Sequence, residues 1–488
     1  MELVKKIGPI GIFLIGFGFW ISILFQFEIK ISSHQLEEIV EIPHLEADWS
    51  SLLKKDALHP IQFAHQVAQI ESAFNQKMIQ MQAWDRRIFN SYTLPLARKV
   101  LSTTWTEKFG IYFFLSFGLM VLGGLWHIFL HTPRGGAHRN HGIYNRNLQR
   151  VGWMVGSFLI VFYIVLYFFP HYLVNWILFF APLARILNGG DASQWFLYGF
   201  LYTVAVLVMG ARMLLKYRDI PYQKWRTFSV MFFQTAFAFL IPEILSACQL
   251  PSADLKNMWP LDYSFFFDYR LEAKLAGGSF GLFLLVWGIA LFVVGVPVLT
   301  YLYGKRWYCS WVCGCGGLAE TLGDPYRQLS NYSQKAWVWE KRIIYTVLGL
   351  VILMTSGVLY HFFTGSSVIA GFISVDNLKY YYGFFIGSIF SGVVGTGFYP
   401  FMGNRVWCRF GCPLAAYLGL VQKWKSRFRI TTNGGQCISC GNCSVYCEQG
   451  IDVRAYAQKG EDIVRASCVG CGICSAVCPR GVLKLENK

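Results

Sequence analysis

Residues 280–303 read FGLFLLVWGIALFVVGVPVLTYLY and continue directly into GKRWYCSWVC at 304–313. The first stretch is an uncharged apolar run, and about 20 such residues are enough to cross the hydrocarbon core of a bilayer. The second stretch places Cys309 and Cys313 just beyond the end of that run. The sequence GNRVWCRFGC at 403–412, 99 residues further on, repeats the glycine, the arginine, an aromatic residue and both cysteines. The chain is therefore predicted to contain membrane helices that twice end in a cysteine pair.

The overall composition also indicates a membrane protein. Of the 488 residues, 55% are hydrophobic and only 14% are charged, whereas ordinary globular domains contain about 25% charged residues. This composition excludes disordered, collagen-like and coiled-coil proteins. The net charge of +16 does not indicate a nucleic-acid partner, because the basic residues lie in loops between apolar runs and not on a basic soluble fold.

Eight apolar runs are long enough to be transmembrane helices. They lie at about 7–27, 110–130, 151–170, 194–214, 227–250, 280–303, 343–363 and 382–403. We interpret residues 1–27 as a retained N-terminal anchor helix, because no small-residue cleavage site follows the first run. Residues 171–193 are apolar but contain Pro182 and Arg185, which predicts an interfacial or re-entrant piece and not a ninth helix.

The orientation follows from the lysine and arginine residues of the loops. The loops at 131–150, 215–226 and 304–342 are basic, whereas acidic residues slightly outnumber basic ones at 251–279. We therefore expect both termini on the cytoplasmic side. The expected location is the inner membrane of a prokaryote, with the lipid bilayer as one partner.

After the last apolar run, residues 437–447 and 468–478 each carry the spacing C-x2-C-x2-C-x3-C. This is the bacterial two-cluster spacing, in which each fourth cysteine ligates the other cluster. It predicts two [4Fe–4S] clusters, one held by Cys437, Cys440, Cys443 and Cys478 and the other by Cys468, Cys471, Cys474 and Cys447. Zinc is the alternative, but eight cysteines in a duplicated spacing disfavour it. Glu448 stands where a proline usually follows the fourth cysteine, while Pro479 keeps that proline.

The fold class is therefore an α-helical integral membrane protein with about eight helices and a C-terminal α+β ferredoxin domain of the bacterial 2[4Fe–4S] type. The predicted parts are the anchor at 1–27, a small extracytoplasmic helical segment at 28–109, a transmembrane domain at 110–422 and a cytoplasmic ferredoxin domain at 423–488. Within the transmembrane domain, the repeated inner-face motifs occupy about 304–316 and 403–413.

The repeated CxxxC pairs form a second group of candidate ligands. Residues four apart share a face of a helix, one turn apart, and a parallel repeat can bring two such motifs together. The four thiols, Cys309, Cys313, Cys408 and Cys412, could hold a third [4Fe–4S] cluster or another thiolate-bound metal. They could also act as redox dithiols or simply pack between helices. Cys315 is a candidate substitute ligand.

These motifs together resemble the NapH/NosR/CcoG-type membrane polyferredoxins. The resemblance covers residues from about 280 to 488 and rests on the paired motifs and the double ferredoxin tail. Cys408, Cys412 and Pro413 match the family's CxxxCP motif, whereas Gly314 stands where the first copy would have a proline. The resemblance implies roles in nitrate reduction, nitrous-oxide reductase maturation or oxidase assembly.

The function that we favour is electron transfer, with the protein acting as a subunit of a respiratory or reductive complex. We favour this role over that of a self-contained enzyme, because no catalytic residue is evident. The partners would be a cytoplasmic or membrane redox protein and, as a candidate, a quinone. Glu243, a carboxylate inside an apolar run, is a candidate proton relay. Haem is not expected. The alternatives are an assembly factor that supplies electrons or reduced metal to a metalloenzyme, and an iron–sulfur redox sensor.

Overall fold

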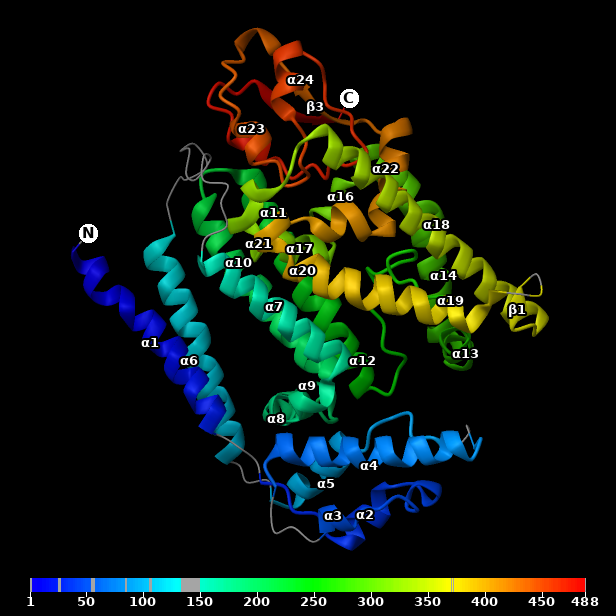
Figure 1. Cartoon of the computed structure of the whole chain (residues 1–488). Coiled ribbons are helices and arrows are strands. Elements are labelled where there is room, and N and C mark those ends of the chain that lie inside the picture. Colours follow the sequence, from blue (N-terminus) through cyan, green and yellow to red (C-terminus); the bar gives the residue numbers. More distant parts are fainter. Residues whose placement is uncertain are drawn as a thin grey trace. The chain divides into compact units, whose positions relative to one another are not determined.

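The structure is a computed structural model, and its fold is almost entirely helical (Figure 1). It describes residues 2–24, 28–53, 58–83, 86–104, 108–132, 150–369, 371 and 373–487. The chain forms two compact units: the first contains Met1–Leu130 with Ile164–Tyr198, and the second contains His131–Tyr163 with Gly199–Lys488.

The first unit begins with a long apolar helix. Its elements are α1 (Glu2–Leu24), α2 (Ser33–Ile39), η1 (Ile42–His44), α3 (Ser50–Leu53), α4 (Pro60–Gln80), α5 (Thr93–Thr104), α6 (Lys108–His131), the end of α7 (Arg150–Phe168), η4 (Pro170–Leu173), α8 (Val174–Phe179), α9 (Ala181–Asn188) and the start of α10 (Gln194–Lys216). Small residues let α1 and α6 pack closely, as is usual between membrane helices. A Cβ on Gly11 would lie 2.8 Å from the carbonyl oxygen of Gly123, and the Ser116 hydroxyl donates to the Gly18 carbonyl at 2.6 Å.

Two segments of this unit lie outside its long apolar helices. Between α1 and α6, helices α4 and α5 are joined through Glu71, whose carboxylate accepts the Tyr92 backbone N–H at 2.7 Å. After α7 the chain turns by 109° before Pro170–Phe179, because a proline disfavours a helical conformation of the residue before it.

The second unit contains the paired cysteine motifs and the C-terminal segment. Its membrane-type part contains α11 (Pro221–Phe232), the π-helix η5 (Phe233–Leu240), α12 (Ile241–Ala247), α13 (Asp268–Ala276), α14 (Gly278–Ala290), the π-helix η6 (Leu291–Gly295), α15 (Val296–Tyr303), α16 (Arg306–Cys309), α17 (Gly314–Thr321), η7 (Asp324–Leu329), α18 (Gln334–Thr364), β1 (Val368–Ile369), β2 (Ile373–Ser374), α19 (Val375–Tyr382), the π-helix η8 (Gly383–Val394), α20 (Gly395–Gly397), α21 (Tyr399–Met402), the π-helix η9 (Trp407–Gly411) and α22 (Pro413–Lys425). The stretch 280–303 thus forms one continuous helical rod, α14–η6–α15.

Five helices of the described residues are long and apolar enough to cross a membrane, and a sixth is added if the bent pair at 152–179 is one span. The five are Gly110–His131, Gln194–Lys216, Pro221–Ala247, Gly278–Tyr303 and Gln334–Thr364. The remaining predicted runs correspond to α1 and to α19–η8–α20, which do not meet the same test of length and hydropathy. The number eight and the orientation therefore stay predictions. Most of the basic loop 131–150 lies outside the described residues.

The C-terminal segment forms a small α+β fold, in the orange and red part of Figure 1. Its elements are β3 (Phe428–Thr432), η10 (Gly434–Gln436), α23 (Asn442–Val445), α24 (Val453–Lys459), α25 (Ile473–Ala476) and β4 (Leu483–Asn487). Strands β3 and β4 pair antiparallel, with Phe428 opposite Asn487 and Thr432 opposite Leu483. This strand pair joins the two ends of the segment. Both cysteine runs lie between the strands in the chain, and they share one small core.

Candidate iron–sulfur centres

Four cysteines from both runs line a first cavity in the C-terminal segment. They are Cys437, Cys440 and Cys443 of the first run and Cys478 of the second. Gly441, at φ +80°, supplies the left-handed turn from which α23 begins, because glycine adopts positive φ without strain. Burial, together with the nearby Cys440 and Cys478, raises the pKa of Cys443 to about 12. A thiol in this setting ionises at neutral pH only if a bound metal stabilises the thiolate.

The second cavity is lined by the complementary set, Cys447, Cys468, Cys471 and Cys474. Three of these side chains are buried and Cys471 is half-buried, whereas Cys440 in the first cavity is exposed. Burial raises the pKa of Cys447 to about 12, against the backbone hydrogen bond from Ile451. The structure thus brings together each set of four cysteines that the spacing predicts.

The two paired cysteine motifs, at 304–313 and 403–412, have the same backbone course. Each follows a helix that ends at a glycine with positive φ, Gly304 at +67° and Gly403 at +91°. In each motif the second cysteine closes a wide turn, since the Cys313 N–H donates to the Tyr308 carbonyl at 2.8 Å and the Cys412 N–H donates to the Trp407 carbonyl at 2.9 Å. The sequence repeat is therefore also a structural repeat.

The prediction that each CxxxC pair lies on one face of a continuous helix is wrong. Cys309 ends α16, and Cys313 is the N-cap of a new helix, α17. In the second copy η9 ends at Gly411, Cys412 is the N-cap of α22, and Pro413 occupies its first position. Proline at the first helical position starts a helix favourably but cannot continue one. The Cys412 sulfur therefore faces a helix N-terminus and accepts the Ala415 N–H at 3.4 Å.

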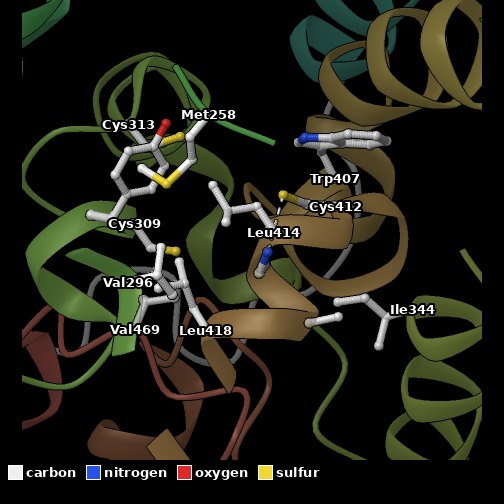
Figure 2. Close-up of a cluster of buried hydrophobic side chains, with 13 residues drawn as sticks. Met258, Val296, Cys309, Cys313, Ile344, Trp407, Cys412, Leu414, Leu418 and Val469 are labelled. Atoms are coloured by element: carbon white, nitrogen blue, oxygen red, sulfur yellow. Dashed lines mark hydrogen bonds between the residues drawn. The ribbon is translucent and has the colours of Figure 1, made fainter. Parts of the chain in front are cut away.

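The four thiols of the two motifs meet in one buried region. Cys309, Cys313, Cys408 and Cys412 are each at most 7% exposed, and Figure 2 shows three of them in one cluster of buried side chains with Met258 and Trp407. The pKa of Cys412 is raised by burial and then by the charges of Cys408, Cys313 and Cys309, which are therefore its neighbours. The half-buried Cys315 contacts Cys313, and this hydrogen bond lowers the pKa of Cys313.

Within the described part of the chain, no three His, Cys, Asp or Glu side chains are placed around a single metal ion. A cluster of four irons spaces its thiolates more widely than one ion does. Each set of four cysteines has the number of thiolates that one [4Fe–4S] cluster uses.

A buried arginine links the two cysteine motifs to the C-terminal segment. Arg405 is fully buried and belongs to the second motif. Its guanidinium donates to the Cys309 carbonyl at 3.2 Å and to the Cys408 sulfur at 3.6 Å. It also pairs with two carboxylates, Glu320 and Glu448, the latter at 3.0 Å. One side chain thus contacts both motifs and the residue that follows Cys447.

The contacts of Glu448 explain why an acid stands where a proline usually follows the fourth cysteine. Its buried carboxylate also accepts a hydrogen bond from Arg327 at 2.6 Å. Burial opposes its ionisation, but Arg405 and Arg327 hold the pKa of this carboxyl below its usual value. Arg327 in turn contacts Asp324, which pairs with further cations, Arg212 at 2.8 Å and Lys216 at 2.7 Å. The sequence signalled this network in two places: the arginine shared by both motif copies, and the acid at the proline position.

The loop around the second cavity lies directly on the first motif. The Ser310 hydroxyl donates to the Val469 carbonyl at 2.8 Å, and the Tyr222 hydroxyl donates to the Gly470 carbonyl at 2.8 Å. Gln422, at the end of α22, donates to the Cys468 carbonyl at 2.9 Å. The second cavity and the paired motifs are therefore neighbours, held together by hydrogen bonds from three helical elements.

Glu243 lies in α12 and is half-buried. Among the described residues it lines neither cysteine cavity and is not part of the cluster around the paired motifs. The structure therefore does not bring the predicted proton-relay residue to the predicted centres.

Comparison with known families supports this assignment of the cysteines to iron–sulfur chemistry. Residues 284–332 and 382–431 each match a family described as a 4Fe-4S binding domain, so both copies of the motif are covered. Residues 436–483 match a 4Fe-4S dicluster domain. The chain therefore contains ferredoxin-type domains that indicate [4Fe–4S] clusters as cofactors, and the predicted resemblance to polyferredoxins is confirmed.

Two curated relatives are similar to the chain. One is the Escherichia coli (strain K12) protein named "Putative electron transport protein YccM", which is 27% identical over 172 residues, 33% of this chain and 46% of the relative. The other is the methylamine utilization ferredoxin-type protein MauN of Methylobacillus flagellatus, 25% identical over 168 residues, 32% of this chain and 54% of the relative. The chain thus matches about half the length of each. No solved structure matches the chain with significance.

Proposed function

We propose that the protein is a membrane-bound electron-transfer protein that exchanges electrons between a redox partner at its ferredoxin domain and a quinone or membrane partner, as a subunit of a respiratory or reductive complex. The observation that carries this proposal is the serial order of three cysteine sets within one compact unit. The first set contains one exposed cysteine, the second set is buried except for the half-buried Cys471, and the third set lies beneath the loop of the second. The name of the relative YccM supports electron transport as the general role.

The ligand assignment is part of the proposal. Each cavity of the ferredoxin domain would hold one cluster through the four cysteines that line it, and the paired motifs would hold a third through Cys309, Cys313, Cys408 and Cys412. When bound, [4Fe–4S] clusters supply one-electron redox chemistry. The residues of this chain exclude water from the second and third sites and place the Arg405 guanidinium between them.

The membrane arrangement is proposed from the distribution of charge. Eight membrane helices with both termini in the cytoplasm would place the ferredoxin domain on that side and the segment 28–109 on the other. Basic loops at 215–226 and 304–342 support this orientation. In this arrangement, the paired motifs lie at the end of the membrane domain that faces the ferredoxin domain.

The proposal is tested by counting iron and acid-labile sulfide per chain after anaerobic purification, with spin quantitation of the reduced protein. With four irons per cluster, about twelve irons per chain are expected. The variant carrying Cys309→Ser and Cys408→Ser would then contain about eight irons and keep the signals of the ferredoxin domain.

Each other result has a defined meaning. About eight irons in the unmodified protein would overturn the third cluster and favour dithiol chemistry at the paired motifs. Fewer than about six would overturn the assignment of both ferredoxin cavities. Full loading with no electron exchange between the ferredoxin domain and a membrane quinone pool or reductant would refute the transfer function and favour a sensor.

A further inference from the structure

The first cysteine cavity opens at the protein surface beside two arginines. Cys440 is exposed, and its neighbour Ile438 is 55% exposed. Arg454 and Arg480 both line the cavity and are exposed, and none of the described acidic side chains lines it. An apolar side chain next to a redox site, with cations at its rim, is the arrangement that favours a transient complex with an acidic protein.

The second cavity cannot serve as such a docking surface. Its cysteines are buried or half-buried, and Glu448, the one charged side chain among the described residues that line it, is paired with arginines. Hydrogen bonds from Ser310 and Tyr222 to the loop 468–472 cover it from the membrane side. Among the sites in the described residues, the first cavity is therefore where a soluble carrier could come close to a cluster.

A separate group of basic residues fits the membrane surface better. Lys423, Lys425 and Arg427 are exposed at the end of α22, and Trp424 between them is 90% exposed. Tryptophan among cations is typical of the headgroup level of a bilayer. Among the described basic residues of the C-terminal segment, only Arg454 and Arg480 line a cysteine cavity.

We propose that Arg454, Arg480 and Ile438 form the docking surface for a small acidic electron-carrier protein of the flavodoxin or ferredoxin class. The inference rests on the proposed electron-transfer function and names the partner at its exposed end. The step moves one electron from the reduced carrier to the centre in the first cavity. The carrier is oxidised by one electron and the centre is reduced by one, with no bond made or broken.

The test uses the full-length protein in nanodiscs of neutral lipid and a reduced acidic flavodoxin as probe, with stopped-flow absorbance of the clusters. The variant R454E/R480E reverses both charges of the docking surface. The matched control, K423E/K425E, makes the same change of net charge at the end of α22. Reduced methyl viologen, a small cation, serves as the second reductant because it needs no docking surface.

With flavodoxin at low salt, R454E/R480E is expected to be reduced about tenfold or more slowly than the unmodified protein, since steering by charge changes association rates by about 10 to 1,000-fold. The unmodified rate should fall as salt rises, and the variant's rate should not. Methyl viologen should reduce the unmodified protein and both variants alike.

Three results would overturn the docking surface. They are an unchanged flavodoxin rate in R454E/R480E, which would also be found if these arginines faced lipid headgroups; an equal loss in the control variant; and a rate in the unmodified protein that does not depend on salt. Reduction by methyl viologen in that case shows that the clusters still accept electrons. If methyl viologen also fails, the proposed function itself is refuted.

Discussion

Substitution of Glu448 by glutamine is the sharpest perturbation that the structure offers. The carboxylate is fully buried and bridges Arg327 and Arg405, at 2.6 and 3.0 Å. The substitution keeps the size of the side chain and removes its charge. It therefore tests whether the charge network holds the ferredoxin domain on the paired motifs.

The expected magnitude follows from the balance of charges. The connected network contains five cations and three carboxylates: Arg212, Lys216, Arg226, Arg327, Arg405, Asp324, Glu320 and Glu448. E448Q leaves those cations with two carboxylates. Removal of one partner from a buried ion pair costs about 3–5 kcal/mol. Because the amide oxygen still accepts one hydrogen bond, we expect a loss of about 3 kcal/mol in the free energy of unfolding.

The assay is urea unfolding in detergent, followed by the absorbance of the clusters. With a urea dependence of about 1–3 kcal/mol per molar, the midpoint of E448Q should fall by about 1–3 M. The control is E461Q, because Glu461 is an exposed acid in the same domain and most exposed substitutions change stability by less than about 0.5 kcal/mol. A midpoint in E448Q equal to that of E461Q would refute the reasoning.

Three further substitutions test other parts of the site. G403A should destabilise the protein by about 2 kcal/mol or more in the same urea assay, because this residue has φ +91° and its new Cβ would lie 2.8 Å from the Ser330 backbone nitrogen. The control is G349A in α18, where the new Cβ meets open space; it should stabilise the protein by about 1 kcal/mol. Cys412→Ser should lower the iron content by about four per chain, while Cys248→Ser, at an exposed cysteine, should leave it unchanged. Gln422→Leu should cost about 1–3 kcal/mol, measured by urea unfolding, because it leaves a carbonyl beside the second cavity and a backbone N–H unpaired.

The grouping of the ferredoxin cysteines could be predicted because the two-cluster spacing is a local pattern with known geometry. Two further features support the grouping that the spacing predicts. They are the antiparallel pair of β3 and β4 and the positive φ of Gly470 and Gly472 in the second loop. The meeting of the paired motifs was predictable for a similar reason, since two copies after similar apolar runs imply equivalent positions. Their local conformation was not, because helical periodicity ignores the new helix that Pro413 begins.

The pairing of the buried charges could not be predicted, because it depends on which elements meet. Glu320 and Asp324 look like surface residues of a basic loop in the sequence, yet both are at most 3% exposed. The cations that pair with them come from α10, α11, η7 and the second cysteine motif. Arg212 and Asp324, for example, are 112 residues apart in the chain. The number of membrane helices stays a prediction, since length and hydropathy do not show where a helix bends or changes to a π-helix.

The two copies of the repeat share a backbone course, but the arginine of each copy makes different contacts. Arg306 of the first copy lies at the edge, donates to Asn487 at 3.0 Å and stacks on the Phe428 ring at 4.8 Å. Arg405 of the second copy is buried between the Cys408 sulfur and Glu448. Equivalent residues of the two copies therefore contact the ferredoxin domain at two points. Arg306 contacts its strand pair at the surface, and Arg405 contacts Glu448 in the buried interior. Because the second point is a buried charge pair, the separation of the second and third cysteine sets is set by packing and not by the length of a linker.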